Sequence, residues 1–343
     1  MEPPYKKNPS LKDIARLVGV SPSTISFVLN GKARQMRISA AVEEKVLVAV
    51  RETGYVPNPV AVSLRTGRSK ILGLIVESVS GSFFSSLARI IENEAGKRGY
   101  KVIYCSTENN AKRGGDWIRT LSELQVDGYI ITPAQGMEKS IMELVAHHKP
   151  VVLMDSFFPA VEVPYVLTDN TCGVIRGMSH LQDKNHDRIG FITSDLRLIQ
   201  MKRREDAYSD YMRDRKLRGY KKLLLKLPYG CQKEEAVRRI AAFIKDTPDL
   251  EAVFFAANYL GVWGLESVTR LGLKIPRDLA VICFDDHDIF RLYPPGITVI
   301  QQPVEKIAEV AIRLLMSQLG ASRLPVKQQQ VLLTPKLVVR KST

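Results

Sequence analysis

The sequence predicts a multidomain protein, in which an all-α helix-turn-helix domain precedes an α/β domain made of two lobes with doubly wound parallel sheets. Three observations support this fold class. The first 54 residues contain three short helical patterns, short apolar runs alternate with helical patterns from residue 71 onward, and positive charge is concentrated at the N-terminal end. The chain has 343 residues, which exceeds one ordinary domain of roughly 100–200 residues.

The first helical pattern covers residues 11–18. Its apolar side chains recur at the i, i+3, i+4 and i+7 spacing of one helix face: Leu11, Ile14, Ala15 and Val18. Ser10 is the expected N-cap, with Asp13 favouring the helix start, and Gly19 is expected to end the helix.

The second helical pattern begins after Ser21, the expected cap, with Pro22 in the first helical position. We expect an inward face of Ile25, Val28 and Leu29 and an outward face of Ser23, Thr24, Ser26 and Phe27. Small hydroxyl residues on an exposed second helix suit phosphate and base-edge contacts in a major groove. A third helix is expected from Ser39 to Thr53, so a generic three-helix bundle is the alternative.

Charge is unevenly distributed along the chain. Residues 1–70 contain 12 Lys and Arg against 5 Asp and Glu, whereas the other 273 residues contain 38 against 31. The charge per residue is therefore almost fourfold higher at the N-terminal end, which favours a polyanionic partner. A basic but merely solvated surface is the alternative.

Residues 58–67 connect this basic part to the rest of the chain. Asn58 can cap a short helix, and Gly67 ends it after about two turns. Isolated helices need roughly 12–15 residues to be stable in water, so we expect this one to form only when it is docked. A plain interdomain linker is the alternative.

The strands of the α/β part are expected at eight apolar runs, each separated from the next by an amphipathic stretch. They cover residues 71–76, 101–105, 128–132, 150–154, 188–193, 222–227, 252–256 and 279–284. This alternation predicts parallel sheets covered by helices, in two groups of four strands. Such a pair of lobes is the periplasmic-binding-protein architecture.

Polar residues follow several of these strands, at the edge where open α/β sheets bind ligands. The candidates are Asp155, Ser194, Asn258 and Asp285, with Arg204 in the next helical stretch. Carboxylates and amides can bind hydroxyl groups, and a guanidinium can bind a carboxylate, a phosphate or a sugar oxygen. Alternatively, the carboxylates cap turns and Arg204 joins a surface ion pair. Phe83 and Phe84 could stack on a ligand or anchor their helix.

Three segments carry a resemblance to a known family: LKDIARLVGVSPSTISFVLNGK, RISAAVEEKV and GYVPNPVAVSLRTGRSKILGLIV. In order and spacing they resemble the LacI/GalR family of transcriptional regulators, and the resemblance continues through nearly the whole chain. It implies a homodimer that binds a near-palindromic double-stranded operator and responds to a small-molecule effector. The DNA-binding positions that it implies are Ser21, Pro22, Ser23, Thr24, Ser26, Phe27, Asn30, Lys32, Ser39, Asn58, Ala61 and Leu64.

The resemblance also assigns roles to the linker and to the cleft. Leu64 would wedge between base pairs in the minor groove, and Ala61 would permit close approach of two hinge helices. The effector would be bound by Asp155, Arg204, Asn258 and Asp285. A sugar or sugar derivative is our first expectation, and a purine-like corepressor the second.

The expected domains are a helix-turn-helix domain at 1–57, a hinge at 58–70 and an effector-binding and dimerisation domain at 71–343. The resemblance implies that the chain crosses between the lobes three times, near residues 165–169, 298–302 and 328–332. The first lobe would then comprise about 71–166 and 301–329, and the second about 167–299 and 330–343.

The sequence also departs from the family pattern. Phe27 stands where the family usually has an arginine, so the operator should differ from the usual one. The segment Lys32–Arg37 is longer and more basic than the common form and could contact phosphates. Tyr259 replaces an aspartate that commonly follows the asparagine, and Ala207 replaces a frequent glycine.

Other patterns give little support to alternative functions. The four cysteines lie far apart, the run from Asp285 to Asp288 is a poor metal site, and no catalytic motif is present, so we expect no cofactor, no metal and no enzyme activity. No apolar stretch approaches the roughly 18 residues of a membrane span, and we expect a cytoplasmic, nucleoid-associated regulator that acts as a repressor. The alternatives are a solute receptor or enzyme on the same fold, and a regulator with a vestigial cleft controlled by a protein partner.

Overall fold

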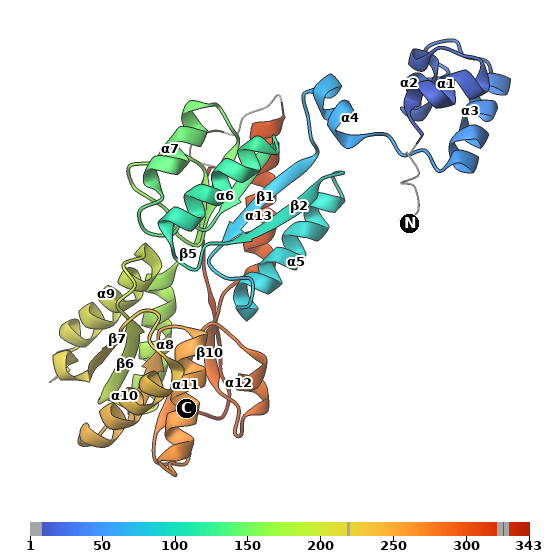
Figure 1. Ribbon diagram of the computed structural model, residues 1–343. Coiled ribbons are helices and arrows are strands. Elements are labelled where there is room, and N and C mark those ends of the chain that lie inside the picture. The colour runs from blue at the N-terminus through green and yellow to red at the C-terminus, as the bar shows by residue number, and fades with distance from the viewer. Residues whose placement is uncertain (1–8, 218–219, 321–324, 326–328) are drawn as a thin grey trace, which may run out of the picture. The chain divides into compact units, whose positions relative to one another are not determined.

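The computed structural model describes residues 9–217, 220–320, 325 and 329–343 (Figure 1). The chain divides into two compact units, Met1–Ser69 and Lys70–Thr343. Each unit has hydrophobic clusters of its own.

The first unit is built from short, well-capped helices: α1 (Leu11–Val18), α2 (Pro22–Leu29), α3 (Ala40–Thr53) and α4 (Pro59–Thr66). The predicted cap at Ser10 is confirmed, since its side chain and that of Asp13 form a reciprocal capping box. Gly19 ends α1 in the left-handed region, at a φ of 74°. The core of α1 to α3 is formed by Ile14, Ala15, Ile25, Val28, Ala33, Val46, Ala49 and Tyr55.

Helix α4 covers the predicted hinge segment. Thr66 donates to the carbonyl of Val62 at 2.9 Å near its last turn, and Gly67 follows at a φ of 68°. Ala61 and Leu64 are exposed, and Leu64 retains 73% of its accessible surface. The segment is therefore helical in this single chain. That the helix forms in water only when it is docked stays a prediction.

The first lobe of the second unit is a six-stranded parallel sheet in the order β11-β5-β4-β3-β1-β2. Its strands are β1 (Ile71–Val76), β2 (Lys101–Ser106), β3 (Gly128–Ile131), β4 (Val151–Met154), β5 (Tyr165–Thr168) and β11 (Gln330–Leu333). Helices α5 (Ser82–Gly96) and α13 (Val304–Leu319) cover one face, and α6 (Ala111–Glu123) and α7 (Glu138–Ala146) cover the other (Figure 1). Strand β1 is buried on both faces, because Leu72 and Leu74 pack toward α5 and α13 while Ile75 packs toward α6.

The second lobe contains the sheet β12-β10-β9-β8-β6-β7. Its strands are β6 (Ile189–Ser194), β7 (Leu224–Leu227), β8 (Ala252–Phe255), β9 (Ala280–Phe284), β10 (Thr298–Gln301) and β12 (Lys336–Val338), of which β12 runs antiparallel to β10. The surrounding helices are α8 (Asn170–Asp183), α9 (Ile199–Asp214), η1 (Tyr220–Leu223), α10 (Lys233–Asp246), α11 (Asn258–Arg270) and α12 (Asp288–Leu292).

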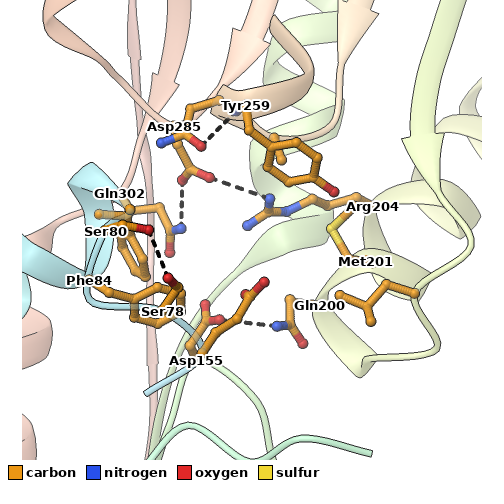
Figure 2. A pocket seen from close by; sticks show the side chains of 16 residues that line it. Ser78, Ser80, Phe84, Asp155, Gln200, Met201, Arg204, Tyr259, Asp285 and Gln302 are labelled. Carbon is orange, nitrogen blue, oxygen red and sulfur yellow. Dashed lines mark hydrogen bonds and ion pairs between the residues drawn. The ribbon is translucent and has the colours of Figure 1, made fainter. Parts of the chain in front are cut away.

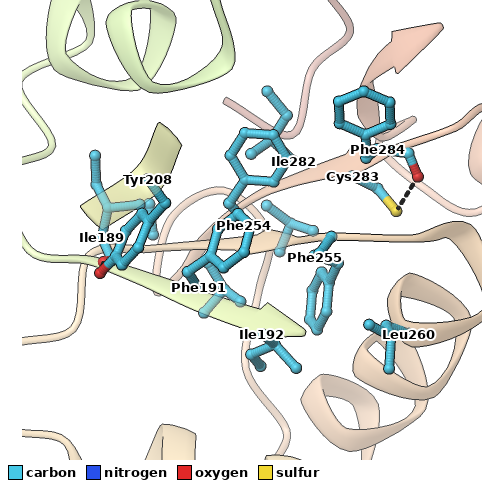
Figure 3. Close-up of a cluster of buried hydrophobic side chains, with 14 of the residues drawn as sticks. Ile189, Phe191, Ile192, Tyr208, Phe254, Phe255, Leu260, Ile282, Cys283 and Phe284 are labelled. Atoms are coloured by element: carbon cyan, nitrogen blue, oxygen red, sulfur yellow. Dashed lines mark hydrogen bonds between the residues drawn. The ribbon is translucent and has the colours of Figure 1, made fainter. Parts of the chain in front are cut away.

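An aromatic cluster fills the interior of the second lobe. Figure 3 shows Phe191 between Tyr208 and Phe254, with ring centroids 4.7 and 5.4 Å apart. Phe255 lies so close to α11 that a Cβ at Gly264 would be 2.0 Å from its ring. Glycine at this position therefore allows the helix to approach the sheet.

The segments at the lobe crossings add strands to both sheets, which corrects the predicted number of strands and one predicted lobe boundary. Four strands per lobe were expected, and six are present in each sheet within the described residues. Strand β11 pairs with β5, from Gln330 opposite Tyr165 to Leu333 opposite Thr168. Residues 330–333 therefore belong to the first lobe and not to the second, and the third crossing lies between β11 and β12 rather than at 328–332. These strands of three or four residues are formed by pairing across the sequence, which no local pattern signals.

Candidate functional site

The outer face of α2 presents the predicted DNA-reading residues. Pro22 and Ser23 are exposed, and Thr24, Ser26 and Phe27 are half-buried. The Ser21 hydroxyl accepts from the backbone N–H of Thr24 at 3.1 Å and caps the helix. Ser23 and Phe27 thus lie on a helix whose start is fixed by its own cap.

Further candidates lie at the end of α2 and in the loop that follows. The Asn30 amide donates to the Ser26 carbonyl, while Lys32 is exposed. Ala33 is only 1% exposed and anchors the segment Lys32–Arg37 to the core, which leaves its basic side chains at the surface. Ser39 is exposed and caps α3 by accepting from the backbone N–H of Val42 at 3.4 Å. Asn58 precedes α4, so the chain places it with Ala61 and Leu64 on the hinge segment.

A pocket of about 220 Å³ lies between the two lobes of the second unit (Figure 2). It is lined from the first lobe by Glu77, Ser78, Ser80, Gly81, Phe83, Phe84 and Asp155. The second lobe contributes Leu196, Gln200, Met201, Arg204, Ala257, Asn258, Tyr259 and Asp285, and Gln302 follows β10 at the second crossing. Polar groups from both lobes therefore meet over one small volume.

Arg204 is held firmly inside this pocket and is only 3% exposed. Its Nε donates to Asn170 Oδ1 at 2.7 Å, and its Nη1 donates to the carbonyl of Ala256 at 2.7 Å. The guanidinium stacks over the ring of Phe284 at 3.6 Å, and Nη1 lies 3.6 Å from Asp285 Oδ2. The alternative of a surface ion pair is therefore wrong.

The carboxylates of the pocket are unusually basic. Burial raises the pKa of Asp155 to about 7, with Asp285 and Glu77 raising it further and Arg204 opposing the rise. The pKa of Asp285 is also raised by burial, against the lowering effects of Arg204 and Gln302. Both residues stand at strand ends with a positive φ, 67° for Asp155 and 71° for Asp285.

Hydrogen bonds connect the two lobes around the pocket. Gln200 Nε2 donates to Asp155 Oδ2 at 3.0 Å, and Asn258 Nδ2 donates to Ser82 Oγ at 3.1 Å. At the rim, the Tyr229 hydroxyl donates to Glu77 Oε1 at 3.0 Å. Opening the cleft would break all of these bonds, so the lobe angle and the pocket are coupled.

The glutamine after β10 links the crossings to the pocket. Gln302 Nε2 donates to Asp285 Oδ1 at 2.6 Å, and its Oε1 accepts a short hydrogen bond from the Thr168 hydroxyl. Thr168 ends β5, directly before the first crossing. The pocket therefore includes the point at which the chain passes from one lobe to the other.

The structure brings together six of the seven effector-site candidates: Phe83, Phe84, Asp155, Arg204, Asn258 and Asp285. Phe83 and Phe84 line the pocket and contact each other edge to face at 5.0 Å, and both also pack on the first-lobe core. Ser194 is not brought into this pocket. It lines a neighbouring pocket of about 600 Å³, which shares Leu196 and Met201 with this one.

Sequence reasoning missed five polar pocket residues: Glu77, Ser78, Ser80, Gln200 and Gln302. Glu77 comes directly after the predicted strand 71–76, and Gln200 lies one turn before Arg204 on the same helix face, so both carried a usable signal. Gln302 had no such signal, since its position follows from the crossing. Tyr259, noticed as a departure, also lines the pocket, and burial raises its pKa to about 12, so it stays a neutral donor and acceptor.

In the part of the chain that the structure describes, no group of three or more His, Cys, Asp or Glu side chains could hold a metal ion. Among the same residues, no helix combines the length and the apolar character needed to cross a membrane.

Comparisons with known proteins agree with this two-part organisation. Residues 10–58 match the model for bacterial regulatory proteins of the lacI family, and residues 178–343 match a periplasmic binding protein-like domain. The chain is 29% identical to the ribose operon repressor of Haemophilus influenzae, with 97% of this chain and 98% of that protein covered. It is 27% identical to the HTH-type transcriptional repressor PurR of Photobacterium profundum, with 97% and 98% covered.

A solved structure of the Lac repressor dimer bound to operator and the anti-inducer ONPF has the same fold. Its TM-score is 0.84 at 20% identity, with 98% of this chain and 99% of that chain covered. The full-length relatives are transcriptional repressors and not enzymes. The chain therefore combines, in this order, a DNA-binding domain that matches the lacI family of bacterial regulatory proteins and a periplasmic binding protein-like domain.

Proposed function

We propose that this chain is a transcriptional repressor whose operator affinity is set by a sugar-like effector bound between the two lobes of its second unit. The observation that carries the effector site is the convergence of Asp155, Arg204, Asn258 and Asp285 on one buried pocket. Carboxylates, an amide and a guanidinium can together accept from and donate to several hydroxyl groups. A homodimer on the bacterial nucleoid, in the cytoplasm, is the proposed working form.

On DNA, α2 of each subunit lies in a major groove and α4 forms the hinge in the minor groove. Ser23 and Phe27 are the proposed base-contacting pair, and Phe27 provides apolar contact to a thymine methyl instead of the two hydrogen bonds of an arginine. Leu64, 73% exposed, is the proposed wedge, since inserting it between base pairs removes its apolar surface from water.

The effector acts by favouring one lobe arrangement over the other. Its contacts come from both lobes, so its affinity depends on the lobe angle, and its effect on the operator cannot exceed that preference. Allosteric coupling of this kind is typically about 1–3 kcal/mol, or roughly 5–150-fold in operator affinity.

The test begins with genomic DNA fragments captured by the full-length protein and sequenced. Affinity for the recovered fragment is then measured by fluorescence anisotropy with D-ribose, with adenine and with no addition. We expect a shared near-palindromic motif and a several-fold change of affinity with the sugar. A response to adenine alone would favour the purine-like alternative, and no preference over random duplex would overturn the function.

A matched variant separates the two sites. Arg204→Gln should keep operator binding in the absence of sugar but lose the response to it, because Arg204 organises the pocket and lies outside the DNA-binding unit. Lys202→Gln is the control, since Lys202 forms an exposed ion pair with Asp206 on the same helix. Equal sugar responses in the Arg204 variant and the control would contradict the assigned effector site.

A further inference from the structure

The wall of the effector pocket is dominated by negative charge and by hydrogen-bond acceptors. Three carboxylates line it, those of Glu77, Asp155 and Asp285, against the single guanidinium of Arg204. With all four groups ionised the lining carries an excess of two negative charges. This imbalance bears directly on which ligands the pocket accepts.

The one cation that lines the pocket is largely engaged by the protein. Arg204 Nε and Nη1 donate to Asn170 and Ala256, and the face of the guanidinium stacks on Phe284. Its nearest carboxylate, Asp285, lies at 3.6 Å. An arginine that binds a phosphate or carboxylate presents two parallel N–H groups to it, and here Nε and Nη1 are both turned to protein acceptors, so only Nη2 is left to face a ligand.

The same pocket contains a buried hydrogen-bond acceptor, the side-chain oxygen of Gln200, that meets no donor in the described part of the chain. Gln200 is 6% exposed, and its Oε1 has no hydrogen-bond partner among the described residues, although its Nε2 donates to Asp155. A buried carbonyl oxygen without a donor is unfavourable, so a ligand N–H or O–H that reaches it adds affinity. The unpartnered atom lies beside a carboxylate, which also accepts and cannot donate when ionised.

We propose that the effector is an uncharged, hydroxyl-rich sugar, and that the pocket excludes the phosphorylated form of the same sugar. The carboxylates accept hydroxyl protons, and Gln200 Oε1 accepts one more. A phosphate would bring two negative charges toward three carboxylates, with one partly engaged guanidinium to pair with. The proposal rests on the proposed function only in taking this pocket as the effector site.

Isothermal titration calorimetry on the full-length protein tests the charge selection. The probes are D-ribose, D-glucose and D-galactose, each paired with its phosphate monoester: D-ribose 5-phosphate, D-glucose 6-phosphate and D-galactose 6-phosphate. We expect at least one uncharged sugar to bind and its monoester to bind at least 100-fold more weakly. A monoester that binds as tightly as its parent sugar, or binding by none of the three sugars, overturns the proposal.

Variants test whether the carboxylates cause the selection. At pH 8, where the Asp155 carboxyl with its pKa of about 7 is mostly ionised, Asp155→Asn keeps the size of the side chain and removes one charge, so the affinity ratio of sugar to monoester should fall about tenfold. Asp206→Asn, on the exposed side of α9 with 52% of its side chain accessible, is the matched control and should leave the ratio unchanged. An unchanged ratio in the Asp155 variant would remove the electrostatic argument.

Operator binding on the same preparations keeps the two proposals distinguishable. If a monoester changes operator affinity and its parent sugar does not, the regulator remains and the charge selection is overturned. If no operator is bound at all, the proposed function fails, while calorimetry still decides which class of ligand the pocket takes.

Discussion

Asp155→Asn should make the sensor unit progressively more stable than the parent protein as the pH rises. The Asp155 carboxyl is 8% exposed and its pKa is raised from 3.8 to about 7, first by burial and then by Asp285 and Glu77, with Arg204 opposing the rise. An acid with a raised pKa holds its proton in the folded state and releases it in the unfolded state. Between about pH 4 and pH 7 the folded protein therefore loses stability as the pH increases.

The size of the effect follows from the two pKa values. One pH unit of difference corresponds to about 1.36 kcal/mol, so the full interval from 3.8 to about 7 amounts to about 4 kcal/mol. About 3 kcal/mol of this loss of folding stability falls between pH 4.5 and pH 8. Asparagine does not titrate, so the difference in unfolding free energy between variant and parent should grow by that amount.

Urea unfolding followed by tryptophan fluorescence measures this difference for the correct unit, because both tryptophans, Trp117 and Trp263, lie in Lys70–Thr343. Asp206→Asn, at an exposed position of the same unit, is the matched control. If the difference in unfolding free energy between the Asp155 variant and the parent is the same at pH 4.5 and at pH 8, ionising the buried carboxyl costs no stability. That result would refute the reasoning.

Four further outcomes follow from individual contacts. Arg340→Ala should lower the unfolding free energy by about 3–5 kcal/mol in urea titrations, because Asp286 loses a partly buried partner. In the parent, Arg340 donates to Asp286 at 2.6 and 3.0 Å, and a loss under about 1 kcal/mol would contradict this reasoning. Gly264→Ala should lower the melting temperature, since its Cβ would meet the Phe255 ring, and an unchanged melting temperature would show that the ring moves freely. Leu64→Ala should weaken operator binding in anisotropy titrations while sugar binding is unchanged; equal operator affinity would remove the wedge. Operator affinity should fall steeply with salt concentration, and a flat dependence would argue against phosphate contacts.

The helices of the first unit could be predicted because their signals are local. Ser10, Ser21 and Ser39 each cap the helix that was expected to follow them, and Gly19 and Gly54 end two of those helices in the left-handed region. Caps and apolar spacing involve residues within about one helical turn of each other. A linear sequence therefore contains all that is needed to locate these elements.

The crossings and parts of the pocket could not be predicted in the same way. Strand β11 exists because residues near 330 pair with residues near 165, and Gln302 joins the pocket because it follows a strand that ends at the lobe boundary. Ser194 shows the opposite error. A polar residue at the carboxyl end of a strand is placed at the ligand edge of the sheet, but Ser194 lines the neighbouring pocket and not the one that contains Arg204.

The hydrogen bonds around Gln302 explain why this pocket can sense lobe angle at all. Thr168 at the first crossing donates to Gln302 at the second, which in turn donates to Asp285 beside Arg204 (Figure 2). A ligand hydroxyl that donates to Asp285 shares this carboxylate with the amide of Gln302 and so changes the strength of the Gln302 hydrogen bond. Because Gln302 is bonded to both crossings, that change acts on the segments that join the two lobes.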